Sequence, residues 1–172
     1  IFLFDALISL GNFALCYPDY IYPDVKNPSD NTFYLEGTNC KHILIPQQER
    51  VGNPVFMNGN GSFSIITGAN MAGKSTYLRT IGLNIILAQL GVPVDCQKFV
   101  FTPVRIISSL STKDSLIKNE SFFYAELKRL QYIIQTLENG EQLFCLLDEI
   151  LKGTNSNDKQ TGSRKLLRKL IN

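Results

Sequence analysis

The stretch GANMAGKS, residues 68–75, stands between a run of small and β-branched residues and a long segment whose apolar residues recur at helical spacing. Gly68, four further residues, Gly73, Lys74 and Ser75 have the spacing of a P-loop. Glycines in such a loop let backbone N–H groups approach phosphate oxygens, and the positive end of the following helix points at the same oxygens. The stretch therefore predicts a phosphate-binding loop that joins a strand to a helix.

The segments around the loop alternate between strand and helix patterns. Apolar residues at spacings of three and four predict helices at residues 1–17, 75–90 and 120–138. Short apolar runs predict strands at residues 62–67, 99–107 and 143–147. Pro, Gly, Asn and Asp predict an irregular linker at residues 18–32 and a loop or hairpin at residues 52–61. The order strand, helix, strand, helix, strand implies an α/β domain with a parallel sheet.

The composition is that of an ordinary globular chain, with 44% hydrophobic and 19% charged residues. No uninterrupted apolar run reaches about 18 residues, so no membrane segment is expected in this chain. The net charge of +2 is too small to indicate nucleic-acid binding by itself. The four cysteines form no CxxC pair, which predicts free thiols, a reducing compartment and a cytoplasmic location. Because the chain begins on Ile1 rather than Met, we expect a piece of a longer protein.

A pair of acids follows the most continuous apolar run, LFCLLDE at residues 143–149. A carboxylate at the end of a strand beside the P-loop strand would lie near the magnesium ion of a bound nucleotide, so Asp148 is a candidate to hold Mg²⁺ through water. Glu149 is a candidate to polarise the water that attacks the γ-phosphate. Lys74 would meet the β- and γ-phosphates, and Ser75 would ligate Mg²⁺. The simpler alternative is an acidic pair that only ends a buried strand.

Three segments resemble the MutS family of DNA mismatch repair proteins. TGANMAGKSTYLR, residues 67–79, closely resembles the family's TGPNMxGKSTYxR, and LLDEILKGTNSND, residues 146–158, resembles its LLDExGRGTSxxD. Between them, ESFFYAEL at residues 120–127 is similar to the STFMxEM signature. Weaker similarities upstream are FDALISLGNFA at residues 4–14, Glu36-Gly37 with His42, and Val51 to Pro54. The resemblance covers essentially the whole chain.

The resemblance implies an α/β P-loop NTPase fold of the ABC-type ATPase kind, with a mostly parallel sheet flanked by helices and preceded by an N-terminal helix. Residues 1–32 would be the end of a preceding helical domain and its linker. Residues 33–172 would be the ATPase domain, truncated at its C-terminal end. Since the family works as a dimer, Ser121 in the signature of one subunit would complete the nucleotide site of the other. The alternative is that Ser121 only caps or adjoins its helix.

Carried onto this sequence, the family's site implies ATP and Mg²⁺ as cofactors. Catalysis would rest on Glu149, Lys74 and Ser121, and Mg²⁺ on Ser75 and Asp148. The nucleotide would be held by Asn53, by Arg50 and by the loop residues Gly68, Ala69, Asn70, Met71, Ala72, Gly73, Lys74, Ser75 and Thr76.

Several residues depart from the family pattern. Arg50 stands where the family usually has an aromatic that stacks on adenine; its guanidinium can stack on a base, or it is a solvated surface arginine. Asn53 matches the family's asparagine, which hydrogen-bonds the base edge or makes a turn before Pro54. The signature and its surroundings also differ at Phe122, Tyr124, Leu151, Lys152 and Asn155.

Two functional hypotheses remain. The first is ATP hydrolysis by the ATPase domain of a MutS-like DNA mismatch repair protein, coupling nucleotide state to a homodimer formed through the ATPase face and to DNA bound by domains absent here. The alternative is a nucleotide-dependent dimerisation module with little catalysis or a role other than mismatch repair. A small-molecule kinase is disfavoured because the sequence has no evident substrate lid. For GSRKLLRKLIN, residues 162–172, a helix packed on a sheet with a solvated basic face is favoured over a membrane or DNA contact.

Overall fold

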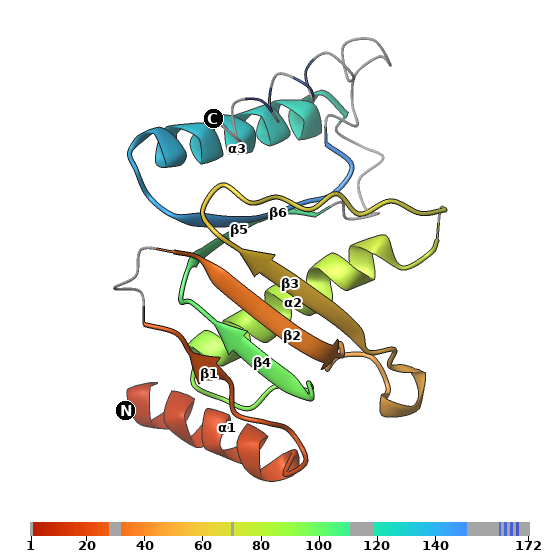
Figure 1. Ribbon diagram of the computed structural model, residues 1–172, viewed down its shortest axis with the longest axis vertical. Helices are drawn as coiled ribbons and strands as arrows, with labels where there is room; N and C mark the ends of the chain where they lie inside the picture. Colours follow the sequence, from red (N-terminus) through yellow and green to blue (C-terminus); the bar gives the residue numbers. More distant parts are fainter. Residues whose placement is uncertain are drawn as a thin grey trace. The chain divides into compact units, whose positions relative to one another are not determined.

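The computed structural model describes residues 2–27, 32–69, 71–110 and 119–150, together with residues 162, 164, 166 and 168. The chain divides into two compact units. The first is Ile1–Asn60 with Ser64–Pro103, and the second is Gly61–Phe63 with Val104–Asn172. Both units contain helix and strand, as an α/β chain requires (Figure 1). The P-loop NTPase arrangement, with one mostly parallel sheet, stays a prediction.

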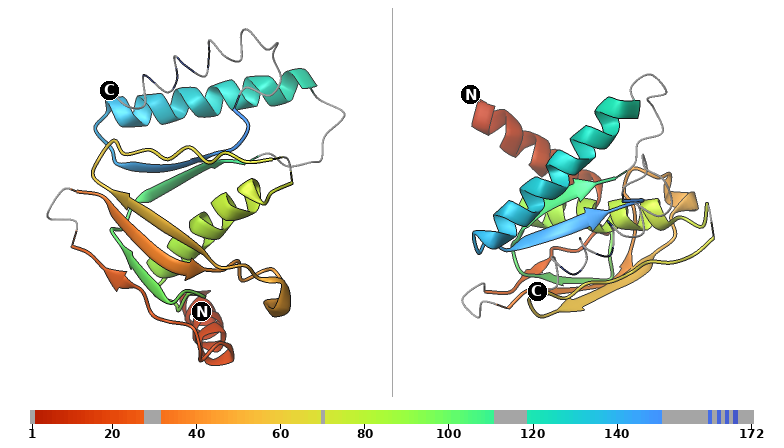
Figure 2. Two further views of the ribbon diagram at one scale, coloured as in Figure 1. Left: turned by 45° about the vertical axis from the view of Figure 1, so that its right-hand side comes forward. Right: turned by 90° about the horizontal axis from the view of Figure 1, so that it is seen from above.

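The first unit is built on a four-stranded mixed sheet in the order β1-β4-β2-β3. β1 (Asp24–Val25) runs parallel to β4 (Lys98–Phe101). β2 (Tyr34–Cys40) runs antiparallel to β4 and to β3 (Asn53–Asn58). The side chains of Leu35, Phe99 and Phe101 are at most 1% exposed, so they form the centre of the core on this sheet. α2 (Lys74–Gln89) contacts β2 and crosses one face of the sheet (Figure 1, Figure 2).

Helix α2 carries its buried residues on one side. Ile81, Ile85 and Ala88 recur at spacings of four and three and are each at most 5% exposed, which is the pattern of a helix packed on a sheet. Asn84 lies in the same buried face, and its Nδ2 donates to the carbonyl of Thr80 at 2.8 Å and to the carbonyl of Lys41 at 3.1 Å. The buried amide is therefore satisfied, and it ties α2 to the chain that leaves β2.

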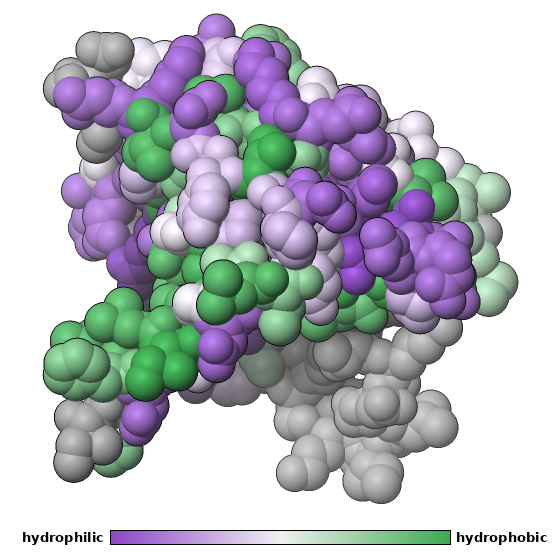
Figure 3. Space-filling model, turned by 90° about the horizontal axis from the view of Figure 1, so that it is seen from below, coloured by the Kyte–Doolittle hydropathy of each residue, from purple (hydrophilic) through white to green (hydrophobic). Residues whose placement is uncertain are grey.

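Helix α1 (Phe2–Cys16) has no buried residue. Its apolar side chains include Phe2 at 91%, Phe4 at 71% and Leu15 at 80% exposure. Figure 3 shows hydrophobic residues gathered on the side of the molecule where α1 lies. The helix therefore owes little of its stability to burial within the described part of the chain.

The end of α1 joins an aromatic stack. The ring of Phe13 lies 5.0 Å from that of Tyr17, measured between ring centroids. Tyr17 in turn stacks on Tyr20 at 4.7 Å, with 13° between the ring planes. These ring contacts connect α1 to the rest of the first unit.

The second unit pairs β5 (Arg105–Ser109) and β6 (Leu143–Leu147) in parallel, with α3 (Asn119–Glu138) against both strands. Ile133 of α3 is fully buried, and it forms one hydrophobic core cluster with the buried residues Leu130 and Leu166. Leu166 lies among helical residues whose exposed neighbours are Arg164 and Arg168. The described residues of segment 162–172 thus fit the prediction of a packed helix with a solvated basic face.

The helix predictions are confirmed at α1, α2 and α3, and the strand prediction at β6. The strand predicted at 62–67 is wrong, because residues 62–69 form neither strand nor helix and Ile65 is 67% exposed. The strand predicted at 99–107 is two strands, β4 and β5, in different sheets. Pro103 lies between them, and a proline cannot donate to a sheet ladder.

The prediction of a loop or hairpin at 52–61 missed most of β3 as a sheet strand, and β2 was not predicted. The linker predicted at 18–32 includes β1 and an isolated bridge between Ile21 and Val94. Among the residues that the structure describes, no helix is both long and apolar enough to cross a membrane.

Candidate functional site

The loop before α2 has the backbone form that its glycines predict. Gly73 is the N-cap of α2 with φ of 87°, a left-handed conformation that glycine adopts without steric cost. Met71 also has a positive φ, of 66°. No side chain caps the helix at Gly73, and the N-terminus of a helix is a favourable place for an anion.

Lys74 folds back along the loop. Its Nζ donates to the carbonyl oxygen of Gly68 at 2.8 Å and to that of Ala69 at 2.7 Å. A lysine ammonium has three donors, so these two bonds leave a third direction for another acceptor. Lys74 is the first residue of α2, and its side chain reaches back to the loop before that helix.

A cavity of about 570 Å³ opens beside this loop, entirely within the first unit. Its size is that of an ordinary small-molecule site. It is lined by His42, Ile45, Glu49, Val51, Asn53, Ile66, Thr67, Ala72, Gly73, Lys74, Thr76, Tyr77 and Thr80. The segment from Ile66 to the first two turns of α2 thus forms one part of the lining, and the segment from His42 to Asn53 forms another.

Several predicted site residues meet at this cavity. Four predicted binding residues from the loop and its helix line it, namely Ala72, Gly73, Lys74 and Thr76, and so does Asn53 at the start of β3. Asn53 Nδ2 donates to the Val51 carbonyl at 3.3 Å, in the manner of a local turn. Asn70 lies outside the described residues.

Further lining residues were not predicted as site residues. Tyr77, one helical turn after Gly73, donates its hydroxyl to the carbonyl of Pro54 at 2.8 Å and so joins α2 to β3. The pKa of His42 is lowered by burial and then by the nearby charge of Arg79, which keeps the imidazole neutral at pH 7. The four-residue spacing from Gly73 to Tyr77 was a usable signal, since it puts both on one side of a helix.

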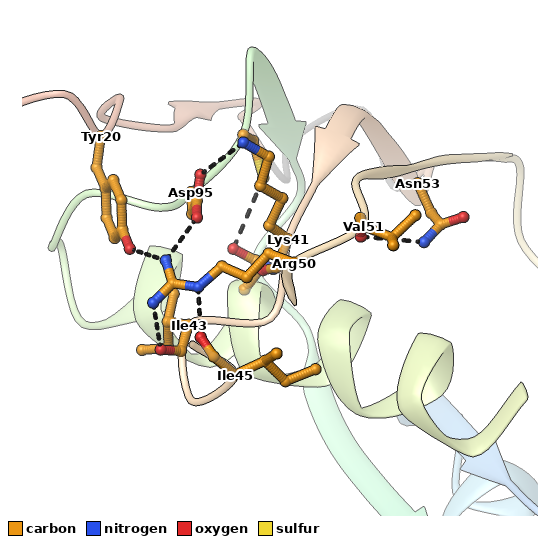
Figure 4. Close-up of polar contacts among 10 residues, drawn as sticks. Tyr20, Lys41, Ile43, Ile45, Arg50, Val51, Asn53 and Asp95 are labelled. Carbon is orange, nitrogen blue, oxygen red and sulfur yellow. Dashed lines mark hydrogen bonds and ion pairs between the residues drawn. The ribbon is translucent and has the colours of Figure 1, made fainter. Parts of the chain in front are cut away.

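Arg50 is not one of the residues that line the cavity. Its Nε donates to the Ile45 carbonyl at 2.6 Å, its second terminal nitrogen to the Ile43 carbonyl at 2.8 Å, and its first to Asp95 Oδ2 at 2.8 Å and to the Tyr20 hydroxyl (Figure 4). The side chain is only 7% exposed, so it is not the solvated surface arginine of the alternative hypothesis. The predicted stack on a base has no support in this position.

The acid pair belongs to the second unit. Asp148 follows β6, and its backbone N–H donates to the Ser109 carbonyl at 2.9 Å, which extends the β5–β6 ladder by one bond. Glu149 is exposed and has φ of 49°. Ser121 lies in α3, with its side chain outside the described part.

Comparison with known proteins gives a family match that covers most of the chain. The family model for MutS domain V matches residues 64–172. The human MutS protein homolog 4 is 32% identical over 91% of this chain, and the DNA mismatch repair protein MutS of Thermotoga petrophila is 34% identical over 84%. The DNA mismatch repair protein MSH3 of Vanderwaltozyma polyspora is 32% identical over 98% of the chain.

The chain spans 16% to 18% of the length of these relatives. The family model begins before the phosphate loop and includes α2, α3 and the acid pair after β6. The chain therefore belongs to the MutS family, and its residues 64–172 correspond to MutS domain V.

Proposed function

We propose that this chain binds Mg·ATP at the cavity beside residues 68–75 and hydrolyses it to ADP and phosphate. The observation that carries the proposal is the cavity itself, lined on one side by Gly73 and Lys74 at the start of α2. No side chain caps this end of α2, and a helix N-terminus favours an anion. A triphosphate is the ligand whose charge fits this end.

Lys74 fits the phosphate end in chemical type. Its Nζ is held by two carbonyl oxygens of the loop, and a phosphate oxygen would provide the acceptor for its remaining donor. The bonds to Gly68 and Ala69 fix the ammonium in place before the nucleotide arrives, so little side-chain entropy remains to be lost on binding.

Mg²⁺ in this proposal is held by the nucleotide phosphates and by the Ser75 hydroxyl. Magnesium commonly keeps several waters and binds through one or two protein groups plus substrate phosphates. When bound, Mg²⁺ neutralises charge on the β- and γ-phosphates.

The residues of the chain have distinct roles in the hydrolysis. Glu149 accepts a proton from the attacking water as that water's oxygen bonds to the γ-phosphorus, and the β–γ bridging oxygen leaves with ADP. Lys74 stabilises the charge on the transferred group. Ser121 of a second subunit would complete the site in a dimer, as the family resemblance implies.

The wider role we propose follows the relatives, two of which are named DNA mismatch repair proteins. Nucleotide state would control a homodimer and its grip on DNA through parts of the protein other than these residues. The four cysteines are free thiols, which fits a reducing, cytoplasmic setting.

A dimerisation module with slow catalysis is the second candidate. Tyr124, in the signature segment, is 60% exposed, and Lys128 Nζ lies 4.6 Å from the centre of its ring. A bulky exposed aromatic there favours a contact surface over a compact catalytic signature. Phosphate release that stays near zero while Mg·ATP drives dimerisation would select this second candidate.

Two substitutions test the proposal in the purified chain and its dimer. Lys74→Ala should weaken Mg·ATP binding by about 30-fold or more in calorimetry, since a charged hydrogen bond contributes about 2 kcal/mol. Glu149→Gln should bind Mg·ATP as the unsubstituted chain does and lose about 100-fold or more in phosphate release.

Lys98→Ala and Glu141→Gln are the matched controls. Both residues are partly exposed and each makes one surface ion pair, with Glu36 and Arg105 respectively. Neither control should change binding or turnover by more than about twofold. Unchanged phosphate release in Glu149→Gln would reject the role of that carboxylate, and unchanged binding in Lys74→Ala would reject the site.

A further inference from the structure

Besides residues 66–80, the cavity lining comes from the irregular segment between β2 and β3 and from the first residue of β3. His42, Ile45, Glu49, Val51 and Asn53 all line the cavity. Between β2 and β3 this segment has only one short 3₁₀ helix, η2 (Gln47–Glu49). A segment with so few backbone bonds of its own depends on side chains to hold its shape.

Arg50, which does not itself line the cavity, supplies that support. Its guanidinium bonds two carbonyl oxygens of the same segment, those of Ile43 and Ile45, at 2.8 Å and 2.6 Å. The same group reaches outside the segment to Asp95 and Tyr20. One buried side chain thus joins the curled segment to two separate parts of the first unit (Figure 4).

The outside partners are themselves fixed. Val94 and Ile21 exchange backbone hydrogen bonds of 2.8 Å and 3.1 Å, so the neighbours Asp95 and Tyr20 are held next to one another. The backbone N–H of Lys41, at the start of the segment, donates to the Asp95 carbonyl at 2.8 Å. Both ends of the segment are therefore bonded to Asp95, one end through the backbone of Lys41 and the other through the side chain of Arg50.

We propose that Arg50 is a positioning residue that sets the shape of the base-binding side of this cavity without touching the nucleotide. This inference rests on the proposed function. If the phosphates lie on the loop at Gly73 and Lys74, the wall that carries Val51 and Asn53 faces the ribose and base. The affinity for the base and the choice between bases then depend on Arg50, whereas the hold on the phosphates does not.

Only an arginine can make this set of contacts. The planar guanidinium offers five N–H donors in a fixed fork, and four acceptors surround Arg50. The carboxylate of Asp95, 15% exposed, balances its buried charge. Lysine would keep the charge and the pairing with Asp95 but would release the carbonyls of Ile43 and Ile45.

The test measures binding of three ligands to the purified chain by calorimetry: Mg·ATP, Mg·GTP and Mg·tripolyphosphate, which has no base. In Arg50→Lys we expect Mg·ATP to bind about tenfold more weakly and the preference between Mg·ATP and Mg·GTP to shrink by a similar factor. Binding of Mg·tripolyphosphate should stay within about twofold. Substitution of a residue that only stabilises the fold would change the affinities for all three ligands together.

Arg105→Lys is the matched control. Arg105 also contacts a carboxylate, Glu141, and a tyrosine hydroxyl, Tyr132, but it lies in the second unit and does not line the cavity. It should leave all three affinities unchanged. If Arg50→Lys does not fold, Tyr20→Phe is the second variant, because it removes a single acceptor of the same guanidinium. It should weaken the binding of Mg·ATP about threefold and leave the binding of Mg·tripolyphosphate unchanged.

Two results would overturn the inference while leaving the proposed function intact. One is that both Arg50→Lys and Tyr20→Phe bind Mg·ATP and Mg·GTP as the unsubstituted chain does. The other is a loss of tripolyphosphate affinity equal to the loss for Mg·ATP. Failure of the unsubstituted chain to bind both Mg·ATP and Mg·tripolyphosphate would instead overturn the proposed function itself, and the inference with it.

Discussion

Gly37, in the middle of β2, has little room for a side chain. A methyl group there would come within 2.9 Å of Val55 Cγ1 and 3.1 Å of Phe99 Cδ2, and it would overlap Cys40 Sγ. A real Cβ needs more space than this, so a larger residue would force the strands apart or displace the thiol. The packing of the sheet therefore requires a residue without a side chain at position 37.

Gly37→Ala should therefore lower the free energy of unfolding by about 1–3 kcal/mol, the usual cost of overpacking a core. Gly11→Ala is the control, because a Cβ at Gly11 in α1 meets nothing within 4 Å. That change should stabilise the chain by about 0.5–1 kcal/mol through helix propensity. Urea denaturation of both variants gives the comparison; equal effects of the same sign would contradict the packing argument.

Single residues of the site were predicted unequally well. Lys74 and Gly73 were located from their spacing alone, because a P-loop is a local pattern. Asn53 was located from the family resemblance. The supporting position of Arg50 was not predicted, because it depends on contacts with Asp95 and Tyr20, each at least 30 residues away in the sequence. Such long-range partners leave no periodic signal in a single sequence.

Among the elements, the three helices were predicted to within about two residues, because each has apolar residues at a clear helical period. The antiparallel pair β2–β3 was not predicted. In β2 only Leu35 is a large buried apolar residue, the other buried positions being Gly37 and Cys40, and the pairing with β3 shifts register between Gly37 and Cys40. The error at residues 62–67 has a related cause: Ile65 and Ile66 favour a strand, but strand propensity becomes structure only where a neighbour pairs with it.

Strand β6 carries a thiol whose behaviour tests the packing of the second unit. Burial raises the pKa of Cys145 to about 11 from 9.0. In the folded chain at pH 8, iodoacetamide should modify the exposed Cys16 about 100-fold faster than Cys145, because the thiolate is the reactive form. Mass spectrometry of timed samples measures the two rates, and urea should remove the difference. Comparable rates without urea would mean that β6 is not packed as described.

The same shift predicts a pH dependence of stability. The unfolded chain loses the Cys145 proton near pH 9, whereas the folded chain keeps it to about pH 11. Between these values the folded state binds more protons, so the free energy of unfolding should fall as pH rises from about 9 to about 11. Cys145→Ser or Cys145→Ala should flatten that part of the curve measured by urea denaturation.

For the whole molecule, the family membership and the trans role proposed for Ser121 predict a site shared between two copies. Lys74→Ala and Ser121→Ala should each be inactive alone. Mixed in equal amounts, half of the dimers would carry one variant of each kind, and each of these has one intact site of two. Phosphate release should thus recover to about a quarter of the unsubstituted rate, since the two sites of a symmetric dimer are equivalent. Absence of any recovery after subunit exchange would show that Ser121 does not act across subunits.

The stacked rings of Tyr17 and Tyr20 give helix α1 a mechanical connection to the segment that lines the cavity beside residues 68–75. Tyr20 touches both Tyr17 and the guanidinium of Arg50, so a displacement of α1 must either carry Tyr20 with it or separate the two rings. A force applied to α1 would strain the wall of the cavity, and nucleotide binding would in turn resist bending at the foot of the helix.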